Sequence, residues 1–209
     1  MTRVKICGLK DGDMVRRAAE SGAHWIGLNF VPASPRFVSL DAAASLLLHV
    51  RGAVPVALVA DFSDDEIDAV AALDFPVLQL HGAETPSRVA EIKARTGREV
   101  WKAVGVSTRT DLEALPDYDA ADRFVIDAKP PKDAAYAGGH GAVFDWSILS
   151  GWRAPKPWLL AGGLTPGNVA EAIRETGAQA VDVSSGVEKV RGWKSAQLIA
   201  DFLAAAKAA

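Results

Sequence analysis

The sequence predicts an α/β protein that folds as a closed (β/α)8 barrel, and three observations support this fold class. Short β-branched runs alternate with Ala-rich amphipathic segments along all 209 residues. Several of these runs, such as Val-Leu-Gln-Leu at 77–80 and Trp-Leu-Leu-Ala at 158–161, are apolar almost throughout, which is typical of strands buried on both faces of a parallel sheet. Eight strand–helix units in a chain of this length fit a TIM barrel near its lower limit of about 200 residues.

The expected elements follow one another in chain order. The strands are expected at 4–7, 25–30, 54–59, 77–80, 100–104, 124–127, 158–161 and 180–184. The helices are expected at 13–21, 40–50, 64–73, 86–96, 111–115, 145–149, 169–176 and 195–208. Two helices have recognisable starts, since Ser63 and Glu66 have the spacing of a capping box and Thr85-Pro86 puts proline at the first helical position.

No change of composition marks a second domain, so residues 1–209 are expected to form a single barrel domain. A doubly wound open sheet is the alternative, and the count of eight units favours the barrel. The longest irregular stretch is 128–142, which contains Pro130-Pro131 and Gly138-Gly139-His140-Gly141. A loop of this length in a compact domain is typically a functional lid or a disordered segment.

The composition argues against several classes of protein. A net charge of −3 without any run of Lys or Arg argues against a nucleic-acid surface. No apolar run approaches the ~20 residues that cross a bilayer, and Met1-Thr2-Arg3-Val4 lacks the apolar stretch of a signal peptide. The single cysteine, Cys7, allows neither an internal disulfide nor CxxC zinc spacing. We therefore expect a cytoplasmic protein with no membrane and no nucleic-acid partner.

Polar residues gather where the expected strands end. Barrel enzymes keep their active sites at the C-terminal ends of their strands, and the opposite ends of these strands carry no comparable set. This asymmetry predicts an enzyme. The residues at the C-terminal ends are Lys5, Cys7, Arg36, Gln79, His81, Asp127, Asp182 and Ser184.

Two glycine-containing turns predict a phosphate site. Gly162-Gly163 follows the seventh expected strand, and Ser184-Ser185-Gly186 ends the eighth. Phosphate sites of barrels often combine these two loops with a short extra helix, whose free amides bind anions. We expect that helix at 187–190, and we expect Asn168 to cap the helix that follows Gly163.

Taken in order, these motifs resemble those of the phosphoribosylanthranilate isomerases of tryptophan biosynthesis. Each motif alone is weak, but the set is specific and covers residues 5 to 188. Two departures are mild, since Leu28-Asn29 replaces a more apolar pair and Ala83 stands where an acidic residue often follows His-Gly. The matching stretches are Lys5-Ile6-Cys7-Gly8, Ser34-Pro35-Arg36, Leu78-Gln79-Leu80-His81-Gly82, Ile126-Asp127-Ala128-Lys129, Gly138-Gly139-His140-Gly141 with Phe144-Asp145-Trp146, Leu160-Ala161-Gly162-Gly163-Leu164 with Asn168-Val169, and Val181-Asp182-Val183-Ser184-Ser185-Gly186-Val187-Glu188.

The resemblance implies an Amadori rearrangement, the third step of tryptophan synthesis from chorismate. The ribose ring of N-(5-phosphoribosyl)anthranilate opens to a Schiff base. Loss of the C2 proton then gives an enolamine, which becomes 1-(2-carboxyphenylamino)-1-deoxyribulose 5-phosphate. By this resemblance Asp127 is the general acid on the ring oxygen and Cys7 is the general base at C2. The family acts on this small phosphorylated substrate with no cofactor and no metal, as a monomer or a homodimer.

The resemblance also implies the binding residues. Arg36 is expected to hold the anthranilate carboxylate. Further substrate contacts are expected from Lys5, Gln79, His81 and Asp182. The phosphate is expected to lie on Gly162, Gly163, Ser184, Ser185 and Gly186.

The two catalytic roles run against ordinary protonation states. A free cysteine, with a pKa of about 8.5, is only a few per cent thiolate at neutral pH, and a free aspartate is almost fully ionised. The site must therefore favour a thiolate at Cys7 and a protonated carboxyl at Asp127. Lys5 shares a strand face with Cys7, because strand side chains alternate, and we expect it to lower the pKa of the thiol.

Other interpretations stay open at the level of sequence. Arg36 alone could form a surface salt bridge, and His81 could be a satisfied core histidine. Indole-glycerol-phosphate synthesis would need a lysine facing two carboxylates, for which Lys102 is the candidate without visible partners. Ribulose-phosphate epimerases would need a metal, and the histidines show no metal-ligand spacing. A phosphate-ligand sensor would keep the two turns but would not need both Cys7 and Asp127.

Overall fold

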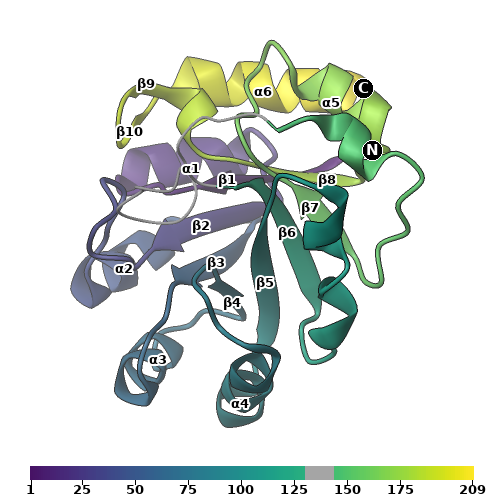
Figure 1. The fold of residues 1–209 in the computed structure, drawn as a ribbon. Helices are drawn as coiled ribbons and strands as arrows, with labels where there is room; N and C mark the ends of the chain where they lie inside the picture. The colour runs from purple at the N-terminus through teal and green to yellow at the C-terminus, as the bar shows by residue number, and fades with distance from the viewer. Residues whose placement is uncertain (130–143) are drawn as a thin grey trace.

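The computed structural model describes residues 1–129 and 144–209, and eight parallel strands form a closed barrel in chain order (Figure 1). The expected lid loop at 128–142 lies outside the described residues from residue 130 onward. The fold class predicted from the sequence is confirmed. The strands are β1 (Arg3–Cys7), β2 (Trp25–Asn29), β3 (Val54–Val59), β4 (Val77–Leu80), β5 (Glu99–Val106), β6 (Arg123–Ala128), β7 (Trp158–Leu160) and β8 (Ala180–Val183).

Within the described residues, six α-helices lie outside the ring of strands (Figure 1). They are α1 (Gly12–Glu20), α2 (Leu40–Leu47), α3 (Asp64–Ala71), α4 (Pro86–Thr96), α5 (Val169–Thr176) and α6 (Ala196–Ala208). The two predicted helix starts are confirmed. Ser63 and Glu66 form the capping box of α3, and Pro86 begins α4 behind the cap of Thr85.

The expected helices at 111–115 and 145–149 are wrong in type, since both are 3-10 turns. The first segment contains η1 (Arg109–Leu112) and η2 (Leu115–Asp117), and the second contains η3 (Trp146–Leu149). Pro116 has no N–H to donate, so the turn at η1 does not continue into an α-helix.

The extra helix expected at 187–190 is also wrong. A single 3-10 turn, η4 (Ser185–Val187), passes directly into β9 (Glu188–Val190), which pairs antiparallel with β10 (Trp193–Lys194). Glu188 and Lys194 are partners in this hairpin, and their side chains form an ion pair of 2.9 Å. The residues after the eighth strand therefore form a hairpin.

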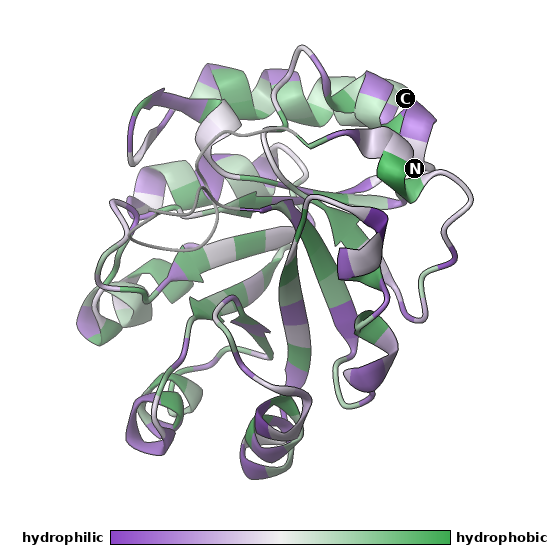
Figure 2. Ribbon diagram, viewed as in Figure 1, coloured by the Kyte–Doolittle hydropathy of each residue, from purple (hydrophilic) through white to green (hydrophobic). Residues whose placement is uncertain are grey.

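Side chains alternate between two cores, because successive strand residues point to opposite faces. One core fills the barrel and contains Trp25, Val56, Val77, Trp101, Ala103, Val125, Leu159, Ala161 and Ala180. The larger core lies between the strands and the helices, and Figure 2 shows mostly apolar strands surrounded by helices of mixed hydropathy. Trp25 and Trp101 pack edge to face inside the barrel, with ring centroids 5.3 Å apart. Within the described residues, no helix has the length and apolar character of a membrane span.

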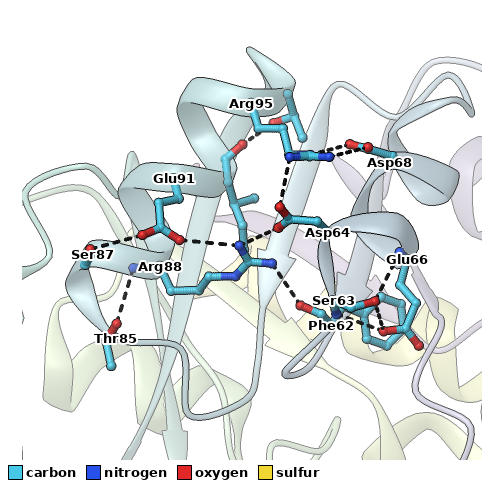
Figure 3. Close-up of polar contacts among 12 residues, drawn as sticks. Phe62, Ser63, Asp64, Glu66, Asp68, Thr85, Ser87, Arg88, Glu91 and Arg95 are labelled. Carbon is cyan, nitrogen blue, oxygen red and sulfur yellow. Dashed lines mark hydrogen bonds and ion pairs between the residues drawn. The ribbon is translucent and has the colours of Figure 1, made fainter.

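The outer surface of α3 and α4 carries a network of exposed ion pairs, which we call the α3–α4 network (Figure 3). Arg95 reaches both Asp68 at 2.6 Å and Asp64 at 2.9 Å, and Arg88 contacts Asp64 at 2.6 Å. Arg88 also donates to the carbonyl of Phe62. The network joins two neighbouring helices on the outside of the barrel.

Candidate active site

The polar residues of β1 and β8 meet inside the barrel. Lys5 lies opposite Asp182 in the parallel register of these strands, and its Nζ is 3.1 Å from both carboxylate oxygens. The Lys5 side chain is fully buried. Burial lowers the pKa of Lys5, but the carboxylate of Asp182, with a smaller share from Cys7, outweighs it and leaves that pKa raised. The interior of the barrel thus holds a permanent ammonium group beside the thiol.

Cys7 lies one interior position beyond Lys5, at the C-terminal end of β1, and its thiol is free and buried. Gly27 of β2 leaves room for both groups. A Cβ atom at this position would come within 2.8 Å of Cys7 Sγ and 3.2 Å of Lys5 Nζ. A glycine in the interior of β2 therefore allows the sulfur and the ammonium to share one face of the barrel.

Lys5 lowers the pKa of Cys7, as expected, but the site as a whole does not, because the net pKa of the thiol is raised. Burial raises the pKa of the Cys7 thiol, and the charge of Asp182 adds to this effect. The ammonium groups of Lys5 and Lys194 oppose burial without overcoming it. The thiol is therefore protonated at neutral pH in the structure described here, and its conjugate thiolate is a strong base.

A second polar group runs from β4 to β6. Asp127 accepts a hydrogen bond from the amide of Ala128 at 2.8 Å, and its other oxygen is 3.4 Å from Nε2 of His81. Nδ1 of His81 is 3.0 Å from the amide nitrogen of Gln79. Since an amide nitrogen donates, Nδ1 accepts in this arrangement, and Nε2 is the ring nitrogen that faces Asp127 as an ion-pair contact. His81 thus connects Gln79 to Asp127.

Gln79 itself is fully buried in the barrel. Its Oε1 is an acceptor without a hydrogen-bond partner among the described residues. Buried acceptors are ordinarily paired, so this oxygen is suited to receive a hydrogen bond from a bound molecule.

The two turns expected to bind phosphate lie against each other. A Cβ at Gly186 would collide with the carbonyl oxygen of Leu164, so only glycine fits where the turn after β8 meets the turn after β7. Ser184 donates its hydroxyl to the carbonyl of Cys7 at 3.1 Å, which ties the eighth strand end to the first. The turns with Gly162, Gly163, Ser184, Ser185 and Gly186 are therefore adjacent to the thiol end of the barrel.

Asn168 is at the first position before α5, but its side chain makes no capping bond to that helix. Its Oδ1 accepts from the amide of Thr165 at 2.7 Å, and its Nδ2 donates to the carbonyl of Gly163 at 3.1 Å. The predicted cap is wrong in this respect, because the side chain stabilises the turn after β7.

Arg36 is buried, so a surface salt bridge is the wrong interpretation of this residue. Its Nε and Nη2 donate to the two carboxylate oxygens of Glu188, at 2.7 and 3.1 Å. Glu188 and Lys194 were not predicted as site residues. Glu188 was visible only as the last residue of the matching motif at 181–188, and no local pattern pointed to Lys194.

Lys102 lies on the outer face of β5, because its neighbours Trp101 and Ala103 point into the barrel. It forms a buried ion pair with Glu84 at 2.8 Å and donates to the carbonyl of Gly82 at 2.7 Å. The carboxylate partner that the sequence did not show is thus present, but it lies outside the barrel. The alternative that needs a catalytic lysine at position 102 is therefore excluded.

Metal-binding side chains do not cluster in the part of the chain that the structure describes. Over residues 1–129 and 144–209, no group of three or more His, Cys, Asp or Glu residues could hold a metal ion.

Comparisons with known proteins agree on one family. The family model described as N-(5'phosphoribosyl)anthranilate (PRA) isomerase matches residues 4–205. The N-(5'-phosphoribosyl)anthranilate isomerase of Hyphomonas neptunium is 62% identical over 208 residues, covering 100% of this chain and 98% of the relative. The enzyme of Paracoccus denitrificans is 53% identical over 208 residues, covering 98% of this chain and 97% of the relative.

Solved structures agree with the sequence comparisons. The phosphoribosyl anthranilate isomerase of Thermotoga maritima superposes with a TM-score of 0.89 at 34% identity, and the match covers 100% of both chains. A second structure of a phosphoribosyl anthranilate isomerase, in complex with reduced 1-(o-carboxyphenylamino)-1-deoxyribulose 5-phosphate, matches with a TM-score of 0.84 at 32% identity, again over 100% of both chains. The chain therefore belongs to the N-(5'-phosphoribosyl)anthranilate isomerase family.

Proposed function

We propose that this chain isomerises N-(5'-phosphoribosyl)anthranilate with Cys7 as general base and Asp127 as general acid. The family to which it belongs carries out this step of tryptophan biosynthesis. The observation that carries the assignment is that a thiol on β1 and a carboxyl on β6 are both at the C-terminal end of the barrel interior. Lys5 lies beside the thiol, and His81 lies beside the carboxyl. Barrel enzymes keep their reacting groups at this end.

The proposed reaction is an internal rearrangement with no net oxidation. Asp127 donates its proton to the ring oxygen of the ribose, the bond between C1 and that oxygen breaks, and a protonated Schiff base forms at C1. Cys7, once its thiol has given its proton to solvent, removes the proton from C2 as the thiolate, and the electron pair of that C–H bond forms the enolamine. Tautomerisation of the enolamine gives the ketone at C2. Proton transfers of this kind typically contribute a factor of about 10² to 10⁴ each.

The surroundings of the two groups support these roles. The raised pKa of Cys7 makes its thiolate a stronger base, while the ammonium groups of Lys5 and Lys194 favour formation of that thiolate. Nε2 of His81 lies 3.4 Å from Asp127, close enough for a protonated Nε2 to stabilise the carboxylate that remains after proton transfer.

The binding contacts are part of the same proposal. Arg36 binds the anthranilate carboxylate, because a guanidinium matches the geometry of a carboxylate. Gln79 and Asp182 contact the sugar hydroxyls. The Oε1 of Gln79, which has no partner among the described residues, supports the contact proposed for Gln79. Lys5 and His81 lie next to the reacting atoms. The adjacent turns with Gly162, Gly163, Ser184, Ser185 and Gly186 hold the phosphate.

The assembly and location of the protein also remain proposals. One solved structure shows monomers generated from the dimeric enzyme of Thermotoga maritima. We propose that this chain is a monomer or a homodimer. Sedimentation velocity at micromolar concentration distinguishes the two. The single cysteine and the substrate of the family support a cytoplasmic enzyme that needs no cofactor and no membrane or nucleic-acid partner.

Loss of the fluorescence of N-(5'-phosphoribosyl)anthranilate tests the proposal directly. The wild-type chain is expected to remove the signal at catalytic concentration, whereas Cys7→Ala and Asp127→Asn lose about 10²- to 10⁴-fold in turnover with a folded barrel. Near-native activity in either variant would contradict the acid–base assignment. Binding without any loss of signal in the wild type would instead identify a sensor.

Exchange of the C2 proton with solvent decides the direction of proton transfer. We expect exchange to stop in Cys7→Ala. If exchange persists there and stops only in Asp127→Asn, the two residues have the opposite roles.

A further inference from the structure

A buried group of three charged side chains joins the segment after β2 to the hairpin after β8, and we call it the hairpin cluster. It consists of Arg36, Glu188 and Lys194, whose side chains are each no more than 5% exposed. Glu188 lies in the middle, with Arg36 on one side at 2.7 Å and Lys194 on the other at 2.9 Å. The roles proposed above use Lys194 only as a second ammonium that influences Cys7, and they do not use Glu188.

The Arg36 end of the cluster lies against the strand that carries the thiol. A Cβ at Gly8 would come within 2.5 Å of Cδ of Arg36, so the stem of the arginine packs directly on the residue after Cys7. The two bonds to Glu188 then fix the plane of the guanidinium. The residue proposed to hold the substrate carboxylate is thus oriented by Glu188.

The Lys194 end of the cluster lies under the turn proposed to hold the phosphate. Its Nζ donates to the carbonyl of Ser184 at 2.9 Å, to the hydroxyl of Ser184 at 3.1 Å and to Glu188 at 2.9 Å. These protein oxygens account for the three N–H groups of an ammonium. Lys194 therefore acts through Ser184 and Glu188 and not by touching the substrate.

The charges of the cluster explain why a buried lysine is useful there. Two cations and one carboxylate leave a net positive charge next to the site of a substrate with a carboxylate and a phosphate. Without Lys194, the charge of Glu188 would cancel that of Arg36. Burial lowers the pKa of Lys194 to about 8, an effect that Arg36 reinforces and Glu188 of β9 and Cys7 of β1 oppose.

We infer that Lys194 is a positioning residue that serves both anionic ends of the substrate. It holds the Ser184 turn in place for the phosphate, and it balances Glu188 so that Arg36 keeps its positive charge for the carboxylate. This inference rests on the proposed function and extends it to a residue that does not contact the substrate.

Replacing Lys194 by methionine, which has a similar length and no charge, tests the inference. In Lys194→Met we expect the KM for the substrate to rise at least tenfold, and the inhibition constant of inorganic phosphate to rise with it. We expect kcat to fall by less than KM rises, because the reacting groups remain and Lys5, the larger cationic influence on Cys7, is unchanged. Lys102→Met is the matched control, since Lys102 is equally buried in an ion pair on the outer face of the barrel. We expect it to keep its KM even if its stability falls.

A double variant separates the charge effect from simple loss of packing. In Lys194→Met/Glu188→Gln, the carboxylate that cancels the charge of Arg36 in the single variant is gone. We therefore expect free anthranilate to inhibit the double variant at least threefold more strongly than it inhibits Lys194→Met. If the double variant binds anthranilate no better than the single variant, Lys194 has a structural role only. An unchanged KM in Lys194→Met would likewise overturn the inference.

Calorimetry can measure the affinity of the wild-type protein for inorganic phosphate as a function of pH, which tests the inference without removing the Lys194 side chain. As the pH rises through about 8, Lys194 loses its proton, and phosphate binding is expected to weaken. The Cys7→Ala variant should show the same loss, which excludes the thiol as its cause, and Lys194→Arg should not show it. A pH-independent affinity in the wild type would contradict the inference. This readout is separate from turnover, so it stands even if the proposed isomerisation fails.

Discussion

The barrel interior and the outer surface of α3 and α4 use the same types of ion pair in opposite surroundings. Inside, Lys5 and Asp182 are 0% and 8% exposed. Outside, Arg95 and Asp68 are 39% and 51% exposed (Figure 3). Water replaces a lost partner at the surface, whereas a charge left alone in the interior has no other solvation. Removing one partner therefore lowers the free energy of unfolding strongly inside the barrel and hardly changes it on the α3–α4 network.

The difference shows why the interior pairs are present at all. A buried ion pair is seldom more stable than well-packed apolar residues of the same volume, because both charges must leave water. Lys5 and Asp182 therefore contribute little to the stability of the fold that leucine and methionine could not contribute. They do hold a positive charge beside Cys7, which apolar residues could not do.

The largest effect is expected from breaking the interior pair. In Lys5→Met, Asp182 is left buried and unpaired, so the free energy of unfolding should fall by about 3–5 kcal/mol, with loss of turnover. In Lys5→Met/Asp182→Leu no charge remains to be solvated, and stability should recover while activity does not. Denaturant titration and the fluorescence assay measure the two quantities. Recovery of activity in the double variant would show that the pair serves the fold alone.

A smaller effect is expected from acid titration of Glu188. Burial acts to raise the pKa of Glu188, but Arg36 and Lys194 outweigh it and lower the pKa to about 2. A carboxyl with a lowered folded-state pKa stabilises the fold above its unfolded-state pKa of about 4.5, and the contribution is lost as the pH falls toward 2. The lost contribution is roughly 3 kcal/mol. Wild type and Glu188→Gln should therefore converge in stability across this range.

Filling the space at Gly27 should have an intermediate effect. In Gly27→Ala, the new methyl group must displace Cys7 Sγ or Lys5 Nζ, and overpacking of this kind costs about 1–3 kcal/mol. We expect turnover to fall more than stability, because the displaced atoms belong to the site. Measured kcat and Tm of this variant check the expectation. The comparison variant is Gly97→Ala at the end of α4, where the left-handed backbone disfavours alanine but no neighbouring atom is displaced. An equal loss of activity in both variants would contradict it.

The smallest effect is expected on the α3–α4 network. In Arg95→Gln, water solvates Asp64 and Asp68, so the Tm should fall by no more than about 2 °C, and the difference should disappear in 0.5 M salt. The activity should stay at the wild-type level. A larger, salt-independent drop in Tm would mean that the exposed network behaves like the interior pairs.

Features that depend on local sequence patterns could be predicted, whereas features that depend on the assembled barrel could not. The eight strands were placed almost to the residue, since their apolar runs are local patterns. The positions of Cys7 and Asp127 at strand ends followed from those runs. The helices at 111–115 and 145–149 were misjudged because Pro116 and the short capped turn at Asp145 outweigh their apolar spacing.

The hairpin cluster could not be predicted in the same way. Arg36 and Glu188 are 152 residues apart, and no periodicity relates them. The sequence at 187–190 also fits a helix start, and only its pairing with Trp193–Lys194 makes it a strand. The partner of Lys102 could not be predicted either, since Glu84 comes from a loop whose path depends on the whole barrel.

By itself, the sequence determined the barrel, the end of it where polar side chains gather, and the identity of the thiol, carboxyl and glycine turns placed there. Alternation along a strand and the rule that parallel strands share their C-terminal edge are enough for this. Only the tertiary structure decided the charge states, because the pKa of Cys7 depends on burial and on which ammonium groups pack around it. Solvation and pairing are properties of the assembled barrel, so Gly27, Glu188 and Lys194 became part of the site only once the chain had closed on itself.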